Sequence, residues 1–126
     1  MKTEVEAKPP QRGDLYLTDP GPGPPVGREQ SGRRPYLVLS IAPMNRSPLR
    51  VVIAVPLTTT DWTNPLHVRV DPAESGLPRV SYAMPEMVRS VSTLCFERRM
   101  GRVPLETVEV AAANTGFLVG LGRTRF

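Results

Sequence analysis

Residues 34–58 read Arg-Pro-Tyr-Leu-Val-Leu-Ser-Ile-Ala-Pro-Met-Asn-Arg-Ser-Pro-Leu-Arg-Val-Val-Ile-Ala-Val-Pro-Leu-Thr. Within this stretch, residues 36–42 and 51–57 are dense runs of branched apolar side chains, which predict two buried strands. Residues 43–48 between them are rich in turn formers. The stretch therefore predicts an antiparallel hairpin with a wide loop.

The register of this hairpin places two polar side chains. If the turn is centred near Arg46, opposed residues have numbers that sum to about 92, so Arg34 faces Thr58 across the strand pair. Directly opposed side chains in antiparallel strands have Cβ atoms about 4.5–5.5 Å apart. We therefore expect a guanidinium and a hydroxyl to converge at one end of the sheet, whereas a slip of one residue would turn them to opposite faces.

The flanking segments predict further short strands and one helix. Strand-like patterns occupy residues 14–18, 66–70, 79–84 and 86–92, with a bend at Pro85. Residues 93–100 predict a short helical turn, and residues 101–103 predict a last short strand. Pro104 then opens a helix that runs to about Leu121. Its predicted packing face comprises Leu105, Val108, Ala112, Thr115 and Val119.

These elements indicate the fold class and the domain limits. A chain of 126 residues has room for one domain, and its 15 prolines favour short strands joined by rigid turns. We expect a mainly β protein with α (α+β), in which a small barrel-like antiparallel sheet carries a C-terminal helix. The domain is predicted to span residues 12–121, between a flexible N-terminal tail of residues 1–11 and a C-terminal tail of residues 122–126.

The charge pattern permits a nucleic-acid partner. The net charge is +4, and all basic residues except Lys2 and Lys8 are arginines. The planar guanidinium suits phosphate oxygens and stacks on bases. Chains from GC-rich genomes also use arginine in place of lysine for no structural reason, so composition alone does not require such a partner.

The remaining composition points to a cytoplasmic protein. Cys95 is the only cysteine, so an intrachain disulfide is excluded. We expect Cys95 to be a small buried hydrophobic residue. The first ten residues lack the apolar segment of a signal peptide, and no stretch approaches the ~20 apolar residues of a membrane span.

A long loop brings further polar groups to the Arg34 end of the hairpin. Residues 19–34 include four glycines and four prolines, and loops of this length inside compact domains tend to be functional or disordered. No set of ligands has the spacing of a metal site, and His67, the only histidine, is expected on the solvent face of a strand. An arginine-centred site suits negative charge that develops on phosphorus, and RNA supplies its own nucleophile in the 2′-OH.

Four motifs in sequence resemble the MazF/PemK/Kid toxins, over about residues 12–121. The opening strand Arg12-Gly13-Asp14-Leu15-Tyr16-Leu17 is followed by the loop Gly27-Arg28-Glu29-Gln30-Ser31-Gly32-Arg33-Arg34-Pro35, which is similar to the family's Gly-x-Glu-Gln-x-Gly-x-Arg-Pro loop. Next come Val55-Pro56-Leu57-Thr58-Thr59-Thr60 and Glu86-Met87-Val88-Arg89-Ser90-Val91. The resemblance implies the SH3-like, CcdB/PemK-type barrel and a metal-independent endoribonuclease that leaves a 2′,3′-cyclic phosphate and a 5′-hydroxyl.

The resemblance also implies the site residues. Arg34 takes the position of the catalytic arginine, Thr58 that of the threonine that stabilises the transition state, and Glu29 that of a loop carboxylate. Each residue also has a non-catalytic interpretation. Arg34 could form an ion pair with Glu29, Thr58 could be an ordinary strand residue, and Glu29 could be a solvated loop charge. The expected RNA contacts are Arg28, Gln30, Arg33, Thr59, Trp62, Glu86, Met87 and Arg89. Two positions depart from relatives: Met87 replaces a common glutamine, and Met84 replaces an arginine of the Kid toxin.

The implied partners are single-stranded RNA, a second copy of the chain in a homodimer, and an acidic MazE-like antitoxin, with no cofactor, metal, membrane or DNA. Trp62, in a polar loop after Thr58, either stacks on a base beside the cut or covers the barrel core or dimer interface. The alternative functions are a non-catalytic SH3-like RNA-binding barrel and a CcdB-like gyrase inhibitor. The chain lacks the C-terminal Trp-x-Ile of the gyrase inhibitors and ends in Arg123-Thr124-Arg125-Phe126.

Overall fold

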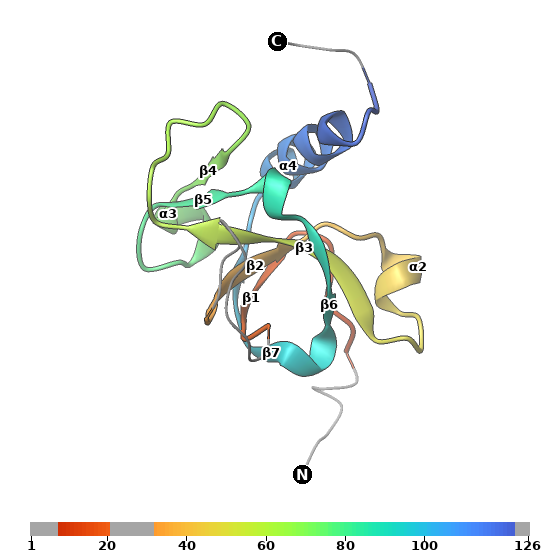
Figure 1. Ribbon diagram of the computed structural model, residues 1–126. Helices are drawn as coiled ribbons and strands as arrows, with labels where there is room; N and C mark the ends of the chain where they lie inside the picture. Colours follow the sequence, from red (N-terminus) through yellow and green to blue (C-terminus); the bar gives the residue numbers. More distant parts are fainter. Residues whose placement is uncertain (1–7, 21–31, 123–126) are drawn as a thin grey trace.

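A curled antiparallel sheet with one long helix forms the protein (Figure 1). The computed structural model describes residues 8–20 and 32–122. Its seven strands follow the order β4-β5-β3-β2-β1-β7, and β6 also pairs with β3. The strands are β1 (Asp14–Thr18), β2 (Arg34–Val38), β3 (Val51–Thr58), β4 (Val68–Val70), β5 (Ser81–Ala83), β6 (Arg89–Ser92) and β7 (Phe96–Arg102). The helices are α2 (Ala42–Asn45), α3 (Pro72–Ser75), η1 (Pro85–Met87), η2 (Thr93–Cys95) and α4 (Leu105–Leu118).

The central hairpin has the predicted register. Tyr36 pairs with Pro56 and Val38 pairs with Ala54, so the residue numbers sum to 92 in each pair. The first strand is shorter than predicted, because β2 ends at Val38 and the chain turns into α2. A buried polar contact forms this turn: the Asn45 amide donates to the Ser40 carbonyl at 2.9 Å, and Ser40 Oγ accepts from the Ile53 N–H at 3.0 Å.

Strand β7 corrects the prediction for residues 93–103. The predicted helical turn is limited to η2, and residues 96–102 form a strand paired with β1, with two irregularities in register. This pairing gives the backbone of both strands hydrogen-bond partners that an isolated turn would lack. Gly101 permits the close packing of α3 on β7, because a Cβ at this position would lie 1.8 Å from the Ser75 carbonyl oxygen.

The strands predicted around Pro85 are shorter than expected. Residues 79–84 yield only β5, residues 66–70 yield only β4, and residues 86–92 yield β6 after the η1 turn. The bend at Pro85 is confirmed, since Pro85 is the first residue of η1 and is buried. Proline cannot donate to a strand ladder, which explains why the chain leaves the sheet here.

Helix α4 packs through part of the predicted face, since Val108 is buried and Ala112 and Thr115 are half-buried. Its buried residues are Val108 and Ala111, whereas Leu105 and Val119 are 66% and 69% exposed. Asn114 fixes the middle of the helix, since its amide donates to the Leu66 carbonyl at 3.0 Å. Contact with β4 and η1, rather than helical periodicity alone, therefore decides which side of α4 is buried.

Two apolar clusters cover opposite faces of the sheet. Leu15, Leu37 and Val55 belong to the cluster that includes Val108 of α4. The other cluster contains Tyr36, Val38, Val52, Ala54 and Val91, and Cys95 packs against it while only partly buried. Alternation along the strands thus provides two cores and leaves the strand ends for polar groups. None of the described helices is long and apolar enough to cross a membrane.

Candidate functional site

Arg34 and Thr58 lie at the same end of the central hairpin. The register observed from Tyr36 to Val38, extended by two residues, would place Arg34 opposite Thr58. The Arg34 Nη1 group donates a hydrogen bond of 3.2 Å to the carbonyl oxygen of Leu57, the residue before Thr58. The structure therefore brings these two residues together, as the register predicted.

The Arg34 guanidinium is partly removed from water and incompletely bonded. Its Nε is buried and has no hydrogen-bond partner among the described residues. Burial lowers the pKa of Arg34 from its ordinary value, and the nearby Tyr36 acts in the opposite direction. A half-buried cation with an unused donor is suited to bind an anion, because charge interactions strengthen where water is excluded.

Thr58 presents a hydroxyl beside this cation. Its Oγ1 accepts the Thr60 N–H at 3.1 Å, which fixes the side chain while leaving the hydroxyl proton able to donate. Thr58 also pairs with Tyr82, so β5 holds its backbone. Thr59 is exposed next to it.

The loop after Thr58 carries Trp62 to the surface. The Asp61 carboxylate accepts the Thr63 N–H at 2.8 Å, and Thr63 has a left-handed backbone with φ of 54°. Trp62 is 50% exposed, so its indole does not fill the protomer core.

His67 differs from its predicted place on a solvent-facing strand. It precedes β4, and its side chain is only 5% exposed. Its Nε2 lies 2.6 Å from the Glu86 Oε2, while its Nδ1 is buried with no partner in residues 8–20 and 32–122. Sequence reasoning missed this contact because it joins segments nineteen positions apart.

The His67–Glu86 contact closes the base of the Trp62 loop. The His67 N–H donates to the Asn64 carbonyl at 3.0 Å, and the Leu66 N–H donates to the Asn64 side chain at 2.8 Å. The Asn114 bond to Leu66 joins the same segment to α4. Residues 64–67 are thus held by both η1 and α4, and Trp62 extends from this anchored base.

The other predicted contacts are dispersed. Glu86 is partly exposed in its bond to His67, and Met87 is half-buried in the same turn. Arg89 is exposed on β6 opposite Ala54, four residues along β3 from Thr58 and outside the Arg34–Thr58 cluster. Arg33 is exposed and donates from Nε and Nη2 to the same oxygen of Glu97, Oε1, at 3.0 and 2.7 Å. The positions of Arg28, Glu29 and Gln30 lie outside the described residues.

The donor set indicates which chemistry the site can support. The described residues contain no group of three or more His, Cys, Asp or Glu side chains placed to hold a metal ion. A guanidinium, a hydroxyl and a half-exposed indole instead offer contacts to an anion and to an aromatic ring. Fold and site together define a small half-open β-barrel protein with a half-buried arginine and a threonine at one end of its central hairpin.

Comparison with known proteins identifies the family. Residues 11–114 match the family described as the PemK-like, MazF-like toxin of type II toxin-antitoxin systems. The chain is 37% identical over 82 residues to endoribonuclease EndoA of Bacillus subtilis, covering 64% of this chain and 69% of that protein. It is 33% identical over 95 residues to endoribonuclease MazF6 of Mycobacterium tuberculosis, covering 74% of this chain and 82% of that protein. The chain therefore belongs to the PemK-like, MazF-like toxin family.

Solved structures share the fold. MazF from Deinococcus radiodurans superposes with a TM-score of 0.76 at 25% identity, covering 90% of this chain and 99% of that chain. A mycobacterial endoribonuclease in complex with its cognate antitoxin superposes with a TM-score of 0.71 at 26% identity, covering 91% of this chain and 99% of that chain.

The anchored loop leads to a prediction for His67. We expect His67→Ala to cost about 0.5–1.5 kcal/mol of folding free energy, because it removes the hydrogen bond between the buried imidazole and the partly exposed Glu86. Trp62 is the only tryptophan, so quenching of its fluorescence by acrylamide reports the loop directly. Quenching should increase in His67→Ala and stay unchanged in the control Arg69→Ala, which removes only an exposed ion pair with Asp71. Equal quenching in wild type and His67→Ala under native conditions would refute the anchoring role.

Proposed function

We propose that this chain is a toxin that cuts single-stranded RNA without a metal ion, with Arg34 and Thr58 as catalytic residues. The observation that supports this proposal most directly is the half-buried Arg34 guanidinium, whose Nε has no hydrogen-bond partner among the described residues. Membership of the toxin family and the endoribonuclease activity named for EndoA and MazF6 support this function. Cleavage of messenger RNA, with transfer or ribosomal RNA as other targets, would stop translation and growth.

The proposed reaction is an attack by the ribose 2′-OH on the adjacent phosphorus. The 2′-oxygen loses its proton as the new P–O bond forms, and the bond to the 5′-oxygen breaks as that oxygen gains a proton. The products are a 2′,3′-cyclic phosphate and a 5′-hydroxyl. Negative charge grows on the non-bridging oxygens, where the Arg34 N–H groups and the Thr58 hydroxyl donate hydrogen bonds. Each preorganised donor contributes on the order of 10²–10³ in rate.

Glu29 is the proposed loop carboxylate that helps to move the protons, by resemblance to the family's loop. Arg28, Gln30, Arg33, Thr59, Trp62, Glu86, Met87 and Arg89 are the proposed RNA contacts. Arg33 must exchange its Glu97 contact for a phosphate, which costs little because both side chains are partly or largely exposed.

The catalytic assignment predicts a loss of cleavage without a loss of fold. Arg34→Ala and Thr58→Ala should each lower kcat by about 10²–10³-fold, because each removes a donor to the transition state. Cleavage of a long single-stranded transcript in EDTA measures this effect, with Arg79→Ala as the control because Arg79 is exposed and has no recorded ion pair with a described residue. Retention of near wild-type cleavage by either catalytic variant, with the melting temperature unchanged, would refute the assignment.

Trp62 is proposed to stack on a base next to the cut site. Trp62 is 50% exposed and follows the proposed catalytic threonine by four positions, and stacking of a base on an aromatic ring is worth about 1–3 kcal/mol. Binding of an RNA with a 2′-O-methyl group at the mapped cut site should quench Trp62 fluorescence. Trp62→Ala should weaken this binding about tenfold without lowering the melting temperature. A lower melting temperature with unchanged RNA affinity would instead assign Trp62 to the core or to an interface.

The proposed assembly is a cytoplasmic homodimer whose paired subunits line one basic groove, because a small barrel offers little concave surface alone. Exposed apolar side chains such as Leu105 and Val119 support an interface. A complex of a related endoribonuclease with its cognate antitoxin supports an acidic partner that binds at Arg28, Arg33 and Arg34. Sedimentation at micromolar concentration should give a dimer, and a monomer would refute the groove.

A further inference from the structure

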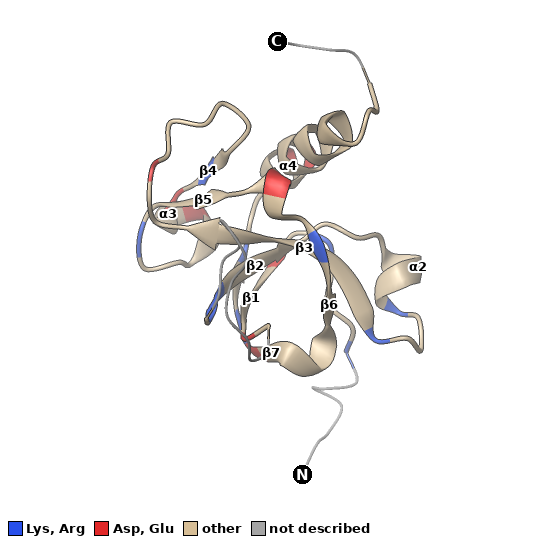
Figure 2. Ribbon diagram, in the orientation of Figure 1, with Lys and Arg blue, Asp and Glu red and all other residues tan. Residues whose placement is uncertain are grey.

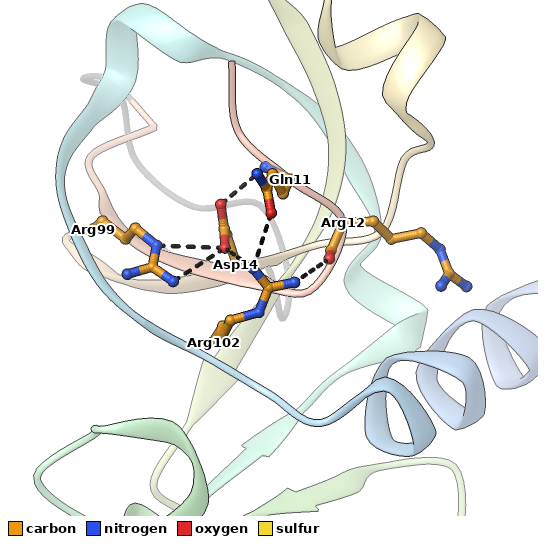
Figure 3. A network of polar contacts seen from close by, with 5 residues as sticks. All are labelled: Gln11, Arg12, Asp14, Arg99 and Arg102. Atoms are coloured by element: carbon orange, nitrogen blue, oxygen red, sulfur yellow. Dashed lines mark hydrogen bonds and ion pairs between the residues drawn. The ribbon is translucent and has the colours of Figure 1, made fainter. Parts of the chain in front are cut away.

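A buried carboxylate organises two arginines at the opposite end of β1 (Figure 3). The Asp14 side chain is 5% exposed, and its Oδ2 accepts the Gln11 N–H at 2.9 Å. Its Oδ1 accepts from Arg102 Nη1 at 3.2 Å and from Arg99 Nε and Nη2 at 3.4 Å. Arg102 also donates to the Gln11 side chain at 3.0 Å and to the Arg12 carbonyl at 3.1 Å. Asp14 is therefore satisfied internally and serves to orient two guanidiniums.

These guanidiniums form part of the wall of a basic cavity of about 660 Å³. The segment before β1, helix α2 and strand β7 all contribute to it, with basic side chains from Lys8, Arg12, Arg46, Arg99 and Arg102. Asp14 is the one carboxylate among the described lining residues, whose five cations and one anion leave an excess of four positive charges. Lys8, Arg12 and Arg46 make no recorded ion pair within residues 8–20 and 32–122.

The cavity is separate from the Arg34–Thr58 cluster but joined to it by two strands. Thr18 pairs with Arg34 on one side and with Phe96 on the other, whereas Asp14 pairs with Arg102. The four residue-to-residue steps from Asp14 to Thr18 span about 13 Å along the strand. Strand β7 runs beside β1 at the edge of the sheet and exposes Arg98, Arg99 and Arg102. Figure 2 shows further basic positions around α2.

We propose that this cavity binds backbone phosphates of the RNA chain that flanks the cut, an inference that rests on the proposed function. The cavity volume of about 660 Å³ is about twenty times the ~30 Å³ that one water molecule occupies, so the cavity has room for more than one phosphate group. The cations come from three separate segments of the chain, which suits a ligand that carries several negative charges. Contacts to phosphate fix the position of RNA without reading its bases, so the site contributes affinity rather than sequence choice.

The test compares long and short substrates in the double variant Arg12→Ala/Arg46→Ala. Arg99 and Arg102 are left intact, because their removal would leave the buried Asp14 charge without a partner. The wild type is first used to map cut sites on a transcript, and RNAs are then made that span one site alone or extend from it on either side. Arg79→Ala is the matched control, since it removes one exposed arginine outside the cavity.

We expect the double variant to raise KM for an extended RNA about tenfold and to leave kcat unchanged, because two charge-assisted contacts are lost. Binding of the extended RNA with a 2′-O-methyl group at the cut should also lose about 1.4 from its salt slope, at about 0.7 per phosphate contact for single strands. Cleavage of the short RNA should match that of the control.

Other outcomes identify which statement fails. If the wild type cuts no RNA, the proposed function itself is wrong. If the wild type cuts RNA while the double variant and the control have equal KM and equal salt slopes on the extended substrate, the cavity does not bind the flanking chain. Weaker binding of an acidic antitoxin segment, with unchanged RNA binding, would overturn the proposal and assign the cavity to the protein partner.

Discussion

The pairing of β2 with β3 is the constraint on which the candidate site depends. Residue numbers that sum to 92 place Tyr36 and Val38 in one core and Leu37 in the other, and they bring Arg34 and Thr58 to the same end. A slip by one residue would expose one apolar set and separate the polar pair. Selection for two buried cores therefore also fixes the distance between the proposed catalytic groups, without any direct bond between them.

The local pattern of the sequence was sufficient to predict an element where the side chains of that element alone determine it. The apolar runs of the hairpin predicted two paired strands and their register, although β2 ends earlier than expected at Val38, and Pro85 predicted the bend after β5. Pattern failed where tertiary contacts decide. Residues 96–102 are a strand because β1 offers a pairing edge, and α4 buries Ala111 rather than Val119 because η1 and β4 contact the middle of the helix.

The candidate site divides in the same way. The Arg34–Thr58 pair followed from the hairpin, since both residues lie on one supersecondary unit. The His67–Glu86 contact and the Asp14–Arg102 contact join positions nineteen and eighty-eight residues apart, and neither spacing has a periodicity that a sequence could reveal. Charges at such separations become predictable only when the barrel has closed and β7 lies beside β1.

Two buried side-chain polar atoms have no hydrogen-bond partner among the described residues. One is the Nε of Arg34, the first residue of β2, and the other is the Nδ1 of His67, at the base of the Trp62 loop. An unsatisfied buried polar group costs about 1–3 kcal/mol, so a fold retains few of them. Because the Arg34 Nε is enclosed, an anion would meet other N–H groups of the guanidinium, and that contact would be strongest when negative charge on phosphorus is greatest. The desolvation cost is carried by the folded protein before substrate arrives, which is how a rigid barrel can favour the transition state over the ground state.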